Sequence, residues 1–325
     1  MQIWKIASAK KLEEEKYEAR NLNENEIKIK FTGAFLSEYD KYSYNGFAPE
    51  YPIRPVSLAV GRVSEAPQDS SYKIGERVVV SPYVYDKEND DLQIMGKTTD
   101  GFLGDFAYVP INNVDVIPEG VTDKDALFID HVSTALNIWE KLNVSKADFV
   151  VIMGADALSI ILAQLCIYYQ AIPIIVSDNE EKLEVARSAG VYYTINLKEE
   201  DPKMLINSYT GGAKAKGSVY IANEGQPLSQ IFDYTAYRGS IAFVSTNSLL
   251  QLKSMIATKN IINGEFDIKV IKNGYDNYTA AMNLLAIKEI KLDNLISKTI
   301  KYANIANELE SATSEQTLFS TIITY

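Results

Sequence analysis

Two residues, Gly154 and Asp178, have the types and spacing needed to hold a dinucleotide. Gly154 follows an apolar run at 149–153, and Asp178 follows a second apolar run at 172–176. In dinucleotide-binding βαβ units, about 20 residues separate the glycine-rich turn from an acid that hydrogen-bonds the adenosine ribose. Such an acid favours NAD(H) and repels the 2′-phosphate of NADP(H). These residues therefore predict an NAD(H) site. Because Ser177-Asp178-Asn179 is also a good helix start, capping is an alternative role for Asp178.

The turn itself departs from the G-x-G-x-x-G pattern, because Asp156 and Ser159 replace its second and third glycines. A carboxylate at a helix N-terminus stabilises the helix by roughly 0.3–1 kcal/mol, and it takes the place that a diphosphate would use. Two like charges about 4 Å apart repel by on the order of 4 kcal/mol at an effective dielectric constant near 20. We therefore expect dinucleotide binding to be weakened by about a thousandfold unless Asp156 points away. The turn residues expected to line the cofactor are Gly154, Ala155, Asp156, Ala157 and Leu158.

The elements that would position these residues fall into two groups. Short strand-like runs separated by turn residues fill the first part of the chain, at 26–32, 57–63, 76–80, 106–110 and 114–117. From Lys124 onward, helical periods alternate with apolar strands, as at 183–189 and 192–195. Alternating strands and helices predict an α/β fold, with a doubly wound parallel sheet covered on both faces.

Length, composition and charge limit the class of protein. With 325 residues and 46% hydrophobic residues, the chain can bury a large core, and its length suggests two domains. A net charge of −11 and a pI near 4.8 argue against nucleic acid or an anionic membrane as partner. The chain shows neither a membrane-spanning apolar run nor a signal peptide, so we expect a cytoplasmic protein. The single cysteine, Cys166, is expected to be a buried hydrophobe and not a reactive thiol.

Several further segments occur in an order that is typical of one family. They are 28–33, 75–80, GFLGDFAYV at 101–109, VIPEG at 116–120, Ser133-Thr134-Ala135 and the βαβ unit. In this order the chain resembles the medium-chain dehydrogenase/reductase superfamily, the zinc-type alcohol dehydrogenases and their relatives, over nearly its full length. The resemblance implies a GroES-like β domain (1–121 and 266–325) and an inserted Rossmann dinucleotide-binding domain (122–265).

The family's catalytic zinc is held by a cysteine in G-x-C-x-[ST]-D, by the histidine and following glutamate of G-H-E, and by a later cysteine or aspartate. Here Phe35 stands at the cysteine position, and Val56-Ser57-Leu58 replaces G-H-E when the two are aligned on Gly61. Only Asp130 matches the third position, and one oxygen ligand cannot hold a zinc ion that takes four ligands. Since Tyr85–Asp100 contains no cysteine, the structural zinc lobe is also missing. We expect no zinc.

Without a metal, a hydroxyl or an imidazole must polarise the substrate or move the proton. The resemblance places Ser37 at the family's proton-relay hydroxyl, and Tyr39 lies in the same loop. His131, the only histidine, follows Asp130 directly, and imidazole is the usual acid or base near neutral pH. Ser37, Tyr39, Asp130 and His131 are thus the catalytic candidates, although a turn serine, a packed tyrosine and a structural histidine are the alternatives.

The resemblance also assigns further cofactor contacts and an assembly. Lys182 would lie near the adenosine ribose and Thr134 near the nicotinamide, and Asn223, Ser245 and Thr246 would lie at strand ends along the cofactor. Relatives pair through an edge strand of the cofactor sheet, for which 241–245 is the candidate, so we expect a homodimer or homotetramer.

Three functions remain open from the sequence. The first is a zinc-independent oxidoreductase that transfers hydride between NAD(H) and a small alcohol, carbonyl or activated alkene. The second is an inactive pseudo-dehydrogenase that binds another ligand or a protein, suggested by the loss of zinc ligands and fingerprint glycines. A NADP(H) quinone reductase is disfavoured by Asp178 and by the absence of an arginine just after it.

Overall fold

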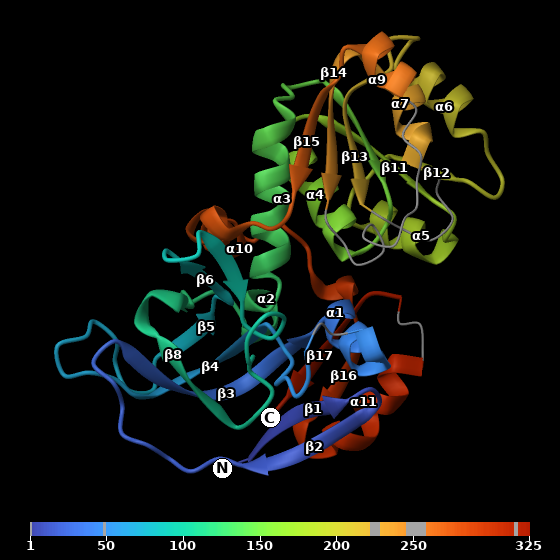
Figure 1. The fold of residues 1–325 in the computed structure, drawn as a ribbon. Coiled ribbons are helices and arrows are strands. Elements are labelled where there is room, and N and C mark those ends of the chain that lie inside the picture. The colour runs from blue at the N-terminus through green and yellow to red at the C-terminus, as the bar shows by residue number, and fades with distance from the viewer. Residues whose placement is uncertain (1, 48–49, 222–227, 245–257, 315–317) are drawn as a thin grey trace. The chain divides into compact units, whose positions relative to one another are not determined.

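The computed structural model describes residues 2–47, 50–221, 228–244, 258–314 and 318–325 (Figure 1). The chain forms two compact units, Met1–Phe128 with Leu295–Tyr325, and Ile129–Asn294. This division agrees with a β unit built from both ends of the chain, as the resemblance implies. No helix in the described ranges combines the length and the apolar character needed to cross a bilayer.

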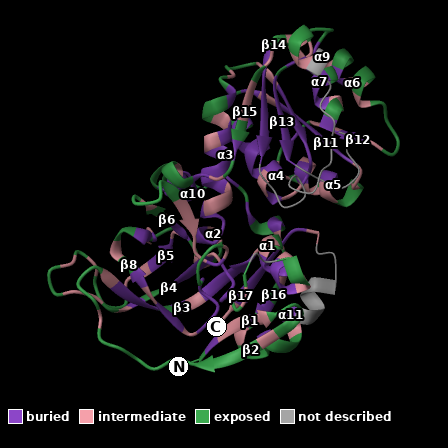
Figure 2. Cartoon of the chain, in the orientation of Figure 1, coloured by how far each residue is buried: buried purple, intermediate pink, exposed green. Residues whose placement is uncertain are grey.

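The first unit is built on a sheet of seven strands among the described residues, ordered β16-β17-β3-β4-β5-β9 with β8 paired to β3. Its strands are β3 (Glu26–Leu36), β4 (Leu58–Glu65), β5 (Arg77–Val80), β8 (Phe106–Pro110), β9 (Val114–Val116), β16 (Ile296–Lys301) and β17 (Ser320–Thr324). Two hairpins accompany it, β1 (Gln2–Ser8) with β2 (Lys11–Lys16), and β6 (Tyr83–Asp86) with β7 (Asp91–Ile94). Its α-helices are α1 (Glu38–Tyr42), α2 (Asp123–Ala126) and α11 (Ile305–Ser314). Buried side chains follow the strands and form one core (Figure 2).

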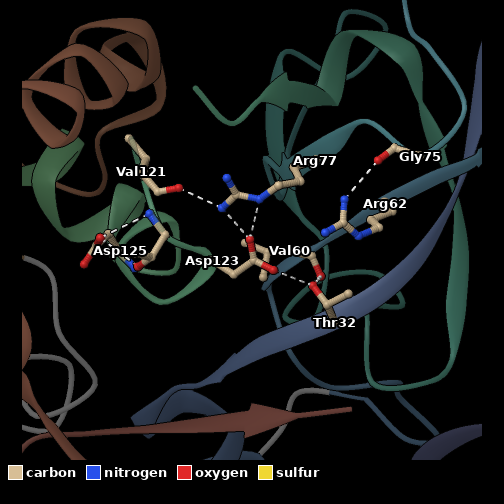
Figure 3. A network of polar contacts seen from close by, with 9 residues as sticks. Thr32, Val60, Arg62, Gly75, Arg77, Val121, Asp123 and Asp125 are labelled. Carbon is tan, nitrogen blue, oxygen red and sulfur yellow. Dashed lines mark hydrogen bonds and ion pairs between the residues drawn. The ribbon is translucent and has the colours of Figure 1, made fainter. Parts of the chain in front are cut away.

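An ion-pair network fixes the segment that leads out of this unit into helix α3 (Figure 3). The Arg77 guanidinium donates to Asp123 Oδ1 at 2.6 and 2.9 Å and to the Val121 carbonyl at 2.7 Å. Asp123 Oδ2 also accepts a hydrogen bond from Thr32 Oγ1 at 2.9 Å. Because the three residues come from β5, α2 and β3, the network ties the end of the segment to the sheet.

Replacing Arg77 by methionine should lower the free energy of unfolding by about 1–2 kcal/mol, since several charge-assisted hydrogen bonds are lost at a half-buried position. Equilibrium urea unfolding measures this change. Arg62 on the neighbouring strand provides the matched control, because it is exposed and donates only to the Gly75 carbonyl among the described residues. Arg62→Met should change stability by less than about 0.5 kcal/mol. Equal losses in the two variants would contradict the role given to the network.

The second unit contains a fully parallel sheet of six strands among its described residues, ordered β12-β11-β10-β13-β14-β15. The strands are β10 (Phe149–Met153), β11 (Ile172–Ser177), β12 (Tyr193–Asn196), β13 (Ala215–Ile221), β14 (Thr235–Val244) and β15 (Asp267–Ile271). Helices cover both faces, which explains why strands such as β10 are apolar without alternation (Figure 1). The α-helices are α3 (Ile129–Leu142), α4 (Ala157–Tyr168), α5 (Glu180–Ser188), α6 (Pro202–Tyr209), α7 (Ile231–Tyr234), α9 (Thr258–Gly264) and α10 (Tyr278–Ile287).

Strand β15 changes two expectations. The sequence analysis ended the α/β domain at residue 265, whereas this unit extends to Asn294 because β15 pairs with β14 and α10 packs on α3.

The pairing of β15 with β14 also shows that the segment 241–245 is not an edge strand of this sheet, so this prediction was wrong. The described part of that segment belongs to β14, which lies between β13 and β15, so the edges of the sheet formed by the described strands are β12 and β15. The polar residues Asp267 and Lys269 within the short strand β15 hid it in the sequence.

Helix α4 is buried along most of its length, which explains its apolar sequence (Figure 2). Cys166 in this helix is fully buried, and burial raises the pKa of its thiol to about 12. The expectation that this cysteine is a small core residue is therefore confirmed.

Candidate functional site

The dinucleotide turn begins at Gly154, the one fingerprint glycine that this chain keeps. Its φ is +127°, a backbone conformation that favours glycine, and its N–H donates to the Val176 carbonyl of β11 at 2.9 Å. The turn therefore joins the carboxyl ends of two neighbouring strands, β10 and β11, and open α/β sheets bind their ligands at this edge.

The two residues that replace the other glycines act together. Asp156 is the N-cap of α4, and its Oδ1 accepts hydrogen bonds from the Ser159 N–H and the Ser159 hydroxyl, both at 2.8 Å. Ser159 is fully buried and Asp156 is half-buried. The expected cap is thus confirmed, and a carboxylate now holds one of the amide donors that helices offer to a pyrophosphate. Of the other predicted turn residues, Ala155 and Ala157 are buried and Leu158 is half-buried.

The acid after β11 is not used as a helix cap. Asn179 caps α5 by accepting a hydrogen bond from the Lys182 N–H at 3.1 Å, so the alternative role for Asp178 was wrong. Asp178 is half-buried directly after β11, and none of the described residues donates a hydrogen bond to its carboxylate. Lys182 lies in the first turn of α5, with a half-buried side chain. The carboxylate therefore retains its capacity to accept hydrogen bonds from a ligand.

Thr134 lies on α3, buried to 7% exposure. A Cβ atom on Gly274 would lie only 2.3 Å from the Ser133 carbonyl carbon and the Thr134 nitrogen, so the backbone at 274 packs directly on this part of the helix. The predicted contacts Asn223, Ser245 and Thr246 lie outside the described residues.

The four catalytic candidates divide between the two units. In the second unit, Asp130 and His131 lie in the first turn of α3, both half-buried, and the Tyr278 hydroxyl donates to Asp130 Oδ1 at 3.2 Å. In the first unit, Tyr39 lies on α1, where burial raises the pKa of its phenol. Its hydroxyl reaches the Lys97 carbonyl only at 3.5 Å.

Ser37 is the N-cap of α1 and is bound to a residue that the sequence analysis missed. The Ser37 hydroxyl donates to Asp40 Oδ2 at 2.5 Å, and Asp40 Oδ1 accepts the Val56 N–H at 2.7 Å. Asp40 is 1% exposed, and burial raises the pKa of its carboxyl. The S-x-x-D spacing of a capping box was the available signal for this pair.

The first-unit positions aligned with zinc ligands offer a poor donor set. Phe35 is buried and packs edge-on against Phe128, with ring centroids 5.7 Å apart. Leu58, directly after Ser57, is buried and pairs with Phe35 across β3 and β4. A phenyl ring and an isobutyl group cannot bind zinc, and a neutral serine is not among its usual ligands. In the described part of the chain, no three His, Cys, Asp or Glu side chains gather as a metal site would require.

Comparisons with known proteins agree with this fold. Residues 157–286 match the zinc-binding dehydrogenase family. The chain is 24% identical over 298 residues to an uncharacterized zinc-type alcohol dehydrogenase-like protein of Haemophilus influenzae, covering 87% of this chain and 86% of that protein.

Two solved structures superpose on the whole chain. The short chain alcohol dehydrogenase rspB of Escherichia coli CFT073, complexed with NADH, has a TM-score of 0.89 at 21% identity and covers 100% of this chain and 99% of its own. A Sinorhizobium meliloti structure of the zinc-binding dehydrogenase type, bound to NADP, has a TM-score of 0.89 at 15% identity, with the same coverage. The sequence match over 157–286, the GroES-like and Rossmann folds and the order of motifs all indicate similarity to the medium-chain dehydrogenase/reductase superfamily, and in particular to its alcohol dehydrogenase-like proteins.

Proposed function

We propose that this protein is a zinc-independent oxidoreductase that transfers hydride between NAD(H) and a small alcohol, carbonyl or activated alkene. The observation that carries the proposal is the Asp178 carboxylate, half-buried after β11 and not used by the cap of α5. A carboxylate in this position accepts hydrogen bonds from both adenosine ribose hydroxyls and repels a 2′-phosphate. The preference for NAD(H) over NADP(H) rests on this residue.

The residues of the second unit fit a dinucleotide, with one obstacle. Gly154 supplies the turn, Asp178 and Lys182 flank the ribose position, and Thr134, Asn223, Ser245 and Thr246 are proposed contacts along the remaining length. Asp156 is the obstacle, because its charge lies at the N-terminus of α4, where a pyrophosphate would bind. When bound, the nicotinamide supplies the hydride.

The zinc-independent part of the proposal is supported by the donor set, since Phe35 and Ser57 stand where relatives offer sulfur and nitrogen. Without a Lewis acid, the substrate oxygen must be polarised by hydrogen-bond donors, and activated alkenes such as enones need less polarisation than simple ketones. Ser37, Tyr39, Asp130 and His131 are the proposed groups that orient the substrate or supply its proton.

We also propose that the protein forms a homodimer or homotetramer in the cytoplasm. Edge strand β15 has a single strand neighbour among the described residues, and Val270 on it is 68% exposed. Ile262 on the nearby helix α9 is also 68% exposed, so pairing through β15 would cover apolar surface. The acidic composition and single cysteine are compatible with a cytoplasmic location.

Calorimetric titration with NADH and NADPH tests the proposal, together with metal analysis of protein purified without added metal. We expect saturable NADH binding, much weaker NADPH binding and less than stoichiometric zinc. Stoichiometric zinc would contradict zinc independence. An absence of NADH binding at millimolar concentration would favour the second candidate, an inactive pseudo-dehydrogenase, which the charge of Asp156 at the turn specifically supports.

A further inference from the structure

The hydroxyl group of Ser57 is buried and makes no hydrogen bond within the described part of the chain. Leaving a buried polar group unpaired costs about 1–3 kcal/mol, so such a group in a native structure calls for an explanation. The hydroxyls of Ser43, Ser70 and Thr321 are in the same state, and the surroundings of Ser57 distinguish it from these three.

The residue before Ser57 is held in a conformation that its side chain disfavours. Val56 has a φ of +75°, which is a genuine outlier for a β-branched residue and costs on the order of 1–3 kcal/mol. Its N–H donates to Asp40 Oδ1 at 2.7 Å, and its carbonyl accepts the Phe102 N–H at 2.8 Å. A Cβ atom on Gly101 would lie 2.3 Å from the Val56 oxygen, so close backbone packing also fixes the segment. Such over-determined strain is concentrated at functional sites.

The same buried carboxylate joins the catalytic candidate Ser37 to Val56, the residue directly before Ser57. Asp40 accepts the Ser37 hydroxyl through one oxygen and the N–H of Val56 through the other. The pairing of β3 with β4 also brings the two serines close together. Phe35 pairs with Leu58 in this antiparallel ladder. Extending this register by one residue puts Ser57 opposite Leu36, directly before Ser37. Both serines therefore lie at one end of the β3–β4 ladder.

The two hydroxyls differ in what they can donate. The Ser37 proton is committed to Asp40, so Ser37 offers a ligand only acceptor capacity. The Ser57 proton has no acceptor among the described residues. Ser57 also stands at the position aligned with the histidine of G-H-E, where relatives hold the metal that polarises the substrate.

We propose that the Ser57 hydroxyl donates a hydrogen bond to the oxygen of a carbonyl-bearing substrate, with Asp40 and the strained Val56 segment as its positioning elements. This inference rests on the proposed function and deepens it by naming the group that binds the substrate oxygen. The ligand class is a small neutral ketone, aldehyde or enone. No proton is transferred from Ser57, which polarises the carbonyl by its hydrogen bond alone.

The test compares Ser57→Ala with Ser70→Ala, which removes a hydroxyl in the same unpartnered state, using 2-cyclohexen-1-one as probe. Ser57→Ala should lower kcat/KM for NADH-dependent reduction by about 10- to 100-fold, while the Kd of NADH stays the same. The free energy of unfolding should not fall, because the alanine removes an unsatisfied group. Ser70→Ala should leave kcat/KM unchanged, and Ser57→Thr, which keeps a hydroxyl, should recover part of the loss.

The carbonyl stretching frequency of the bound enone gives a readout that a structural role would not move. The hydrogen bond should lower this frequency in the wild type, and Ser57→Ala should raise it. An unchanged frequency or kcat/KM in Ser57→Ala would overturn the proposal, as would a fall in stability with no other effect. If the wild type binds NADH but not the enone, the Ser57 proposal fails alone; if it does not bind NADH, the proposed function fails.

Discussion

Replacing Asp156 by glycine should tighten NADH binding, by up to about a thousandfold if the carboxylate lies within about 4 Å of the pyrophosphate in the wild-type complex. The wild-type carboxylate is held at the N-terminus of α4 by its two hydrogen bonds to Ser159, so it cannot leave without giving up the cap. Glycine removes the charge and restores the backbone approach that the fingerprint glycine provides. Calorimetric titration with NADH measures the change.

Asp156→Asn separates charge from space in this experiment. Asparagine is as good an N-cap as aspartate, so the helix keeps its cap while the repulsion disappears. We expect an affinity between those of the wild type and the glycine variant. The glycine variant should lose only about 1 kcal/mol of stability, which includes the lost partner of the buried Ser159 hydroxyl. If all three proteins bind NADH equally, Asp156 does not oppose the cofactor.

Asp178→Ala should raise the Kd of NADH by about 10- to 100-fold, since hydrogen bonds to a charged group contribute about 1.5–3 kcal/mol. The same change removes the charge that repels a 2′-phosphate, so the ratio of the NADPH and NADH dissociation constants should fall. Parallel titrations with both cofactors measure this ratio.

Asn179→Ala is the matched control, because it alters the neighbouring side chain and removes the actual cap of α5. It should lower the free energy of unfolding by about 1 kcal/mol while the ratio of the two dissociation constants stays the same. A loss of stability without a change in cofactor ratio in Asp178→Ala would mean that the acid is structural.

Much of the architecture could be predicted from local patterns. The runs at 149–153 and 172–176 lie within β10 and β11, and Gly154 has the backbone conformation that its place in the fingerprint requires. These features are local, because a buried parallel strand needs a continuous apolar run and a tight turn needs glycine. The capping role of Asp156 was equally accessible, since a cap involves residues only three apart.

Other features depended on contacts between distant parts of the chain. Strand β15 became an edge only by pairing with β14, and no local pattern identifies which strand a sheet ends on. Asp178 and Asn179 are both acceptable caps by composition, and the direction of each side chain decided that Asn179 bonds Lys182.

The sequence by itself determined the parallel sheet, its glycine turn and the residue types at the positions aligned with the family's zinc ligands, because these follow from neighbours along the chain. The tertiary structure alone decided that Asp40 joins Ser37 to Val56 and that the Ser57 hydroxyl is buried without a partner among the described residues. The physical reason is that burial and long-range hydrogen bonds are set by how separate segments pack, and spacing along the chain does not encode that packing.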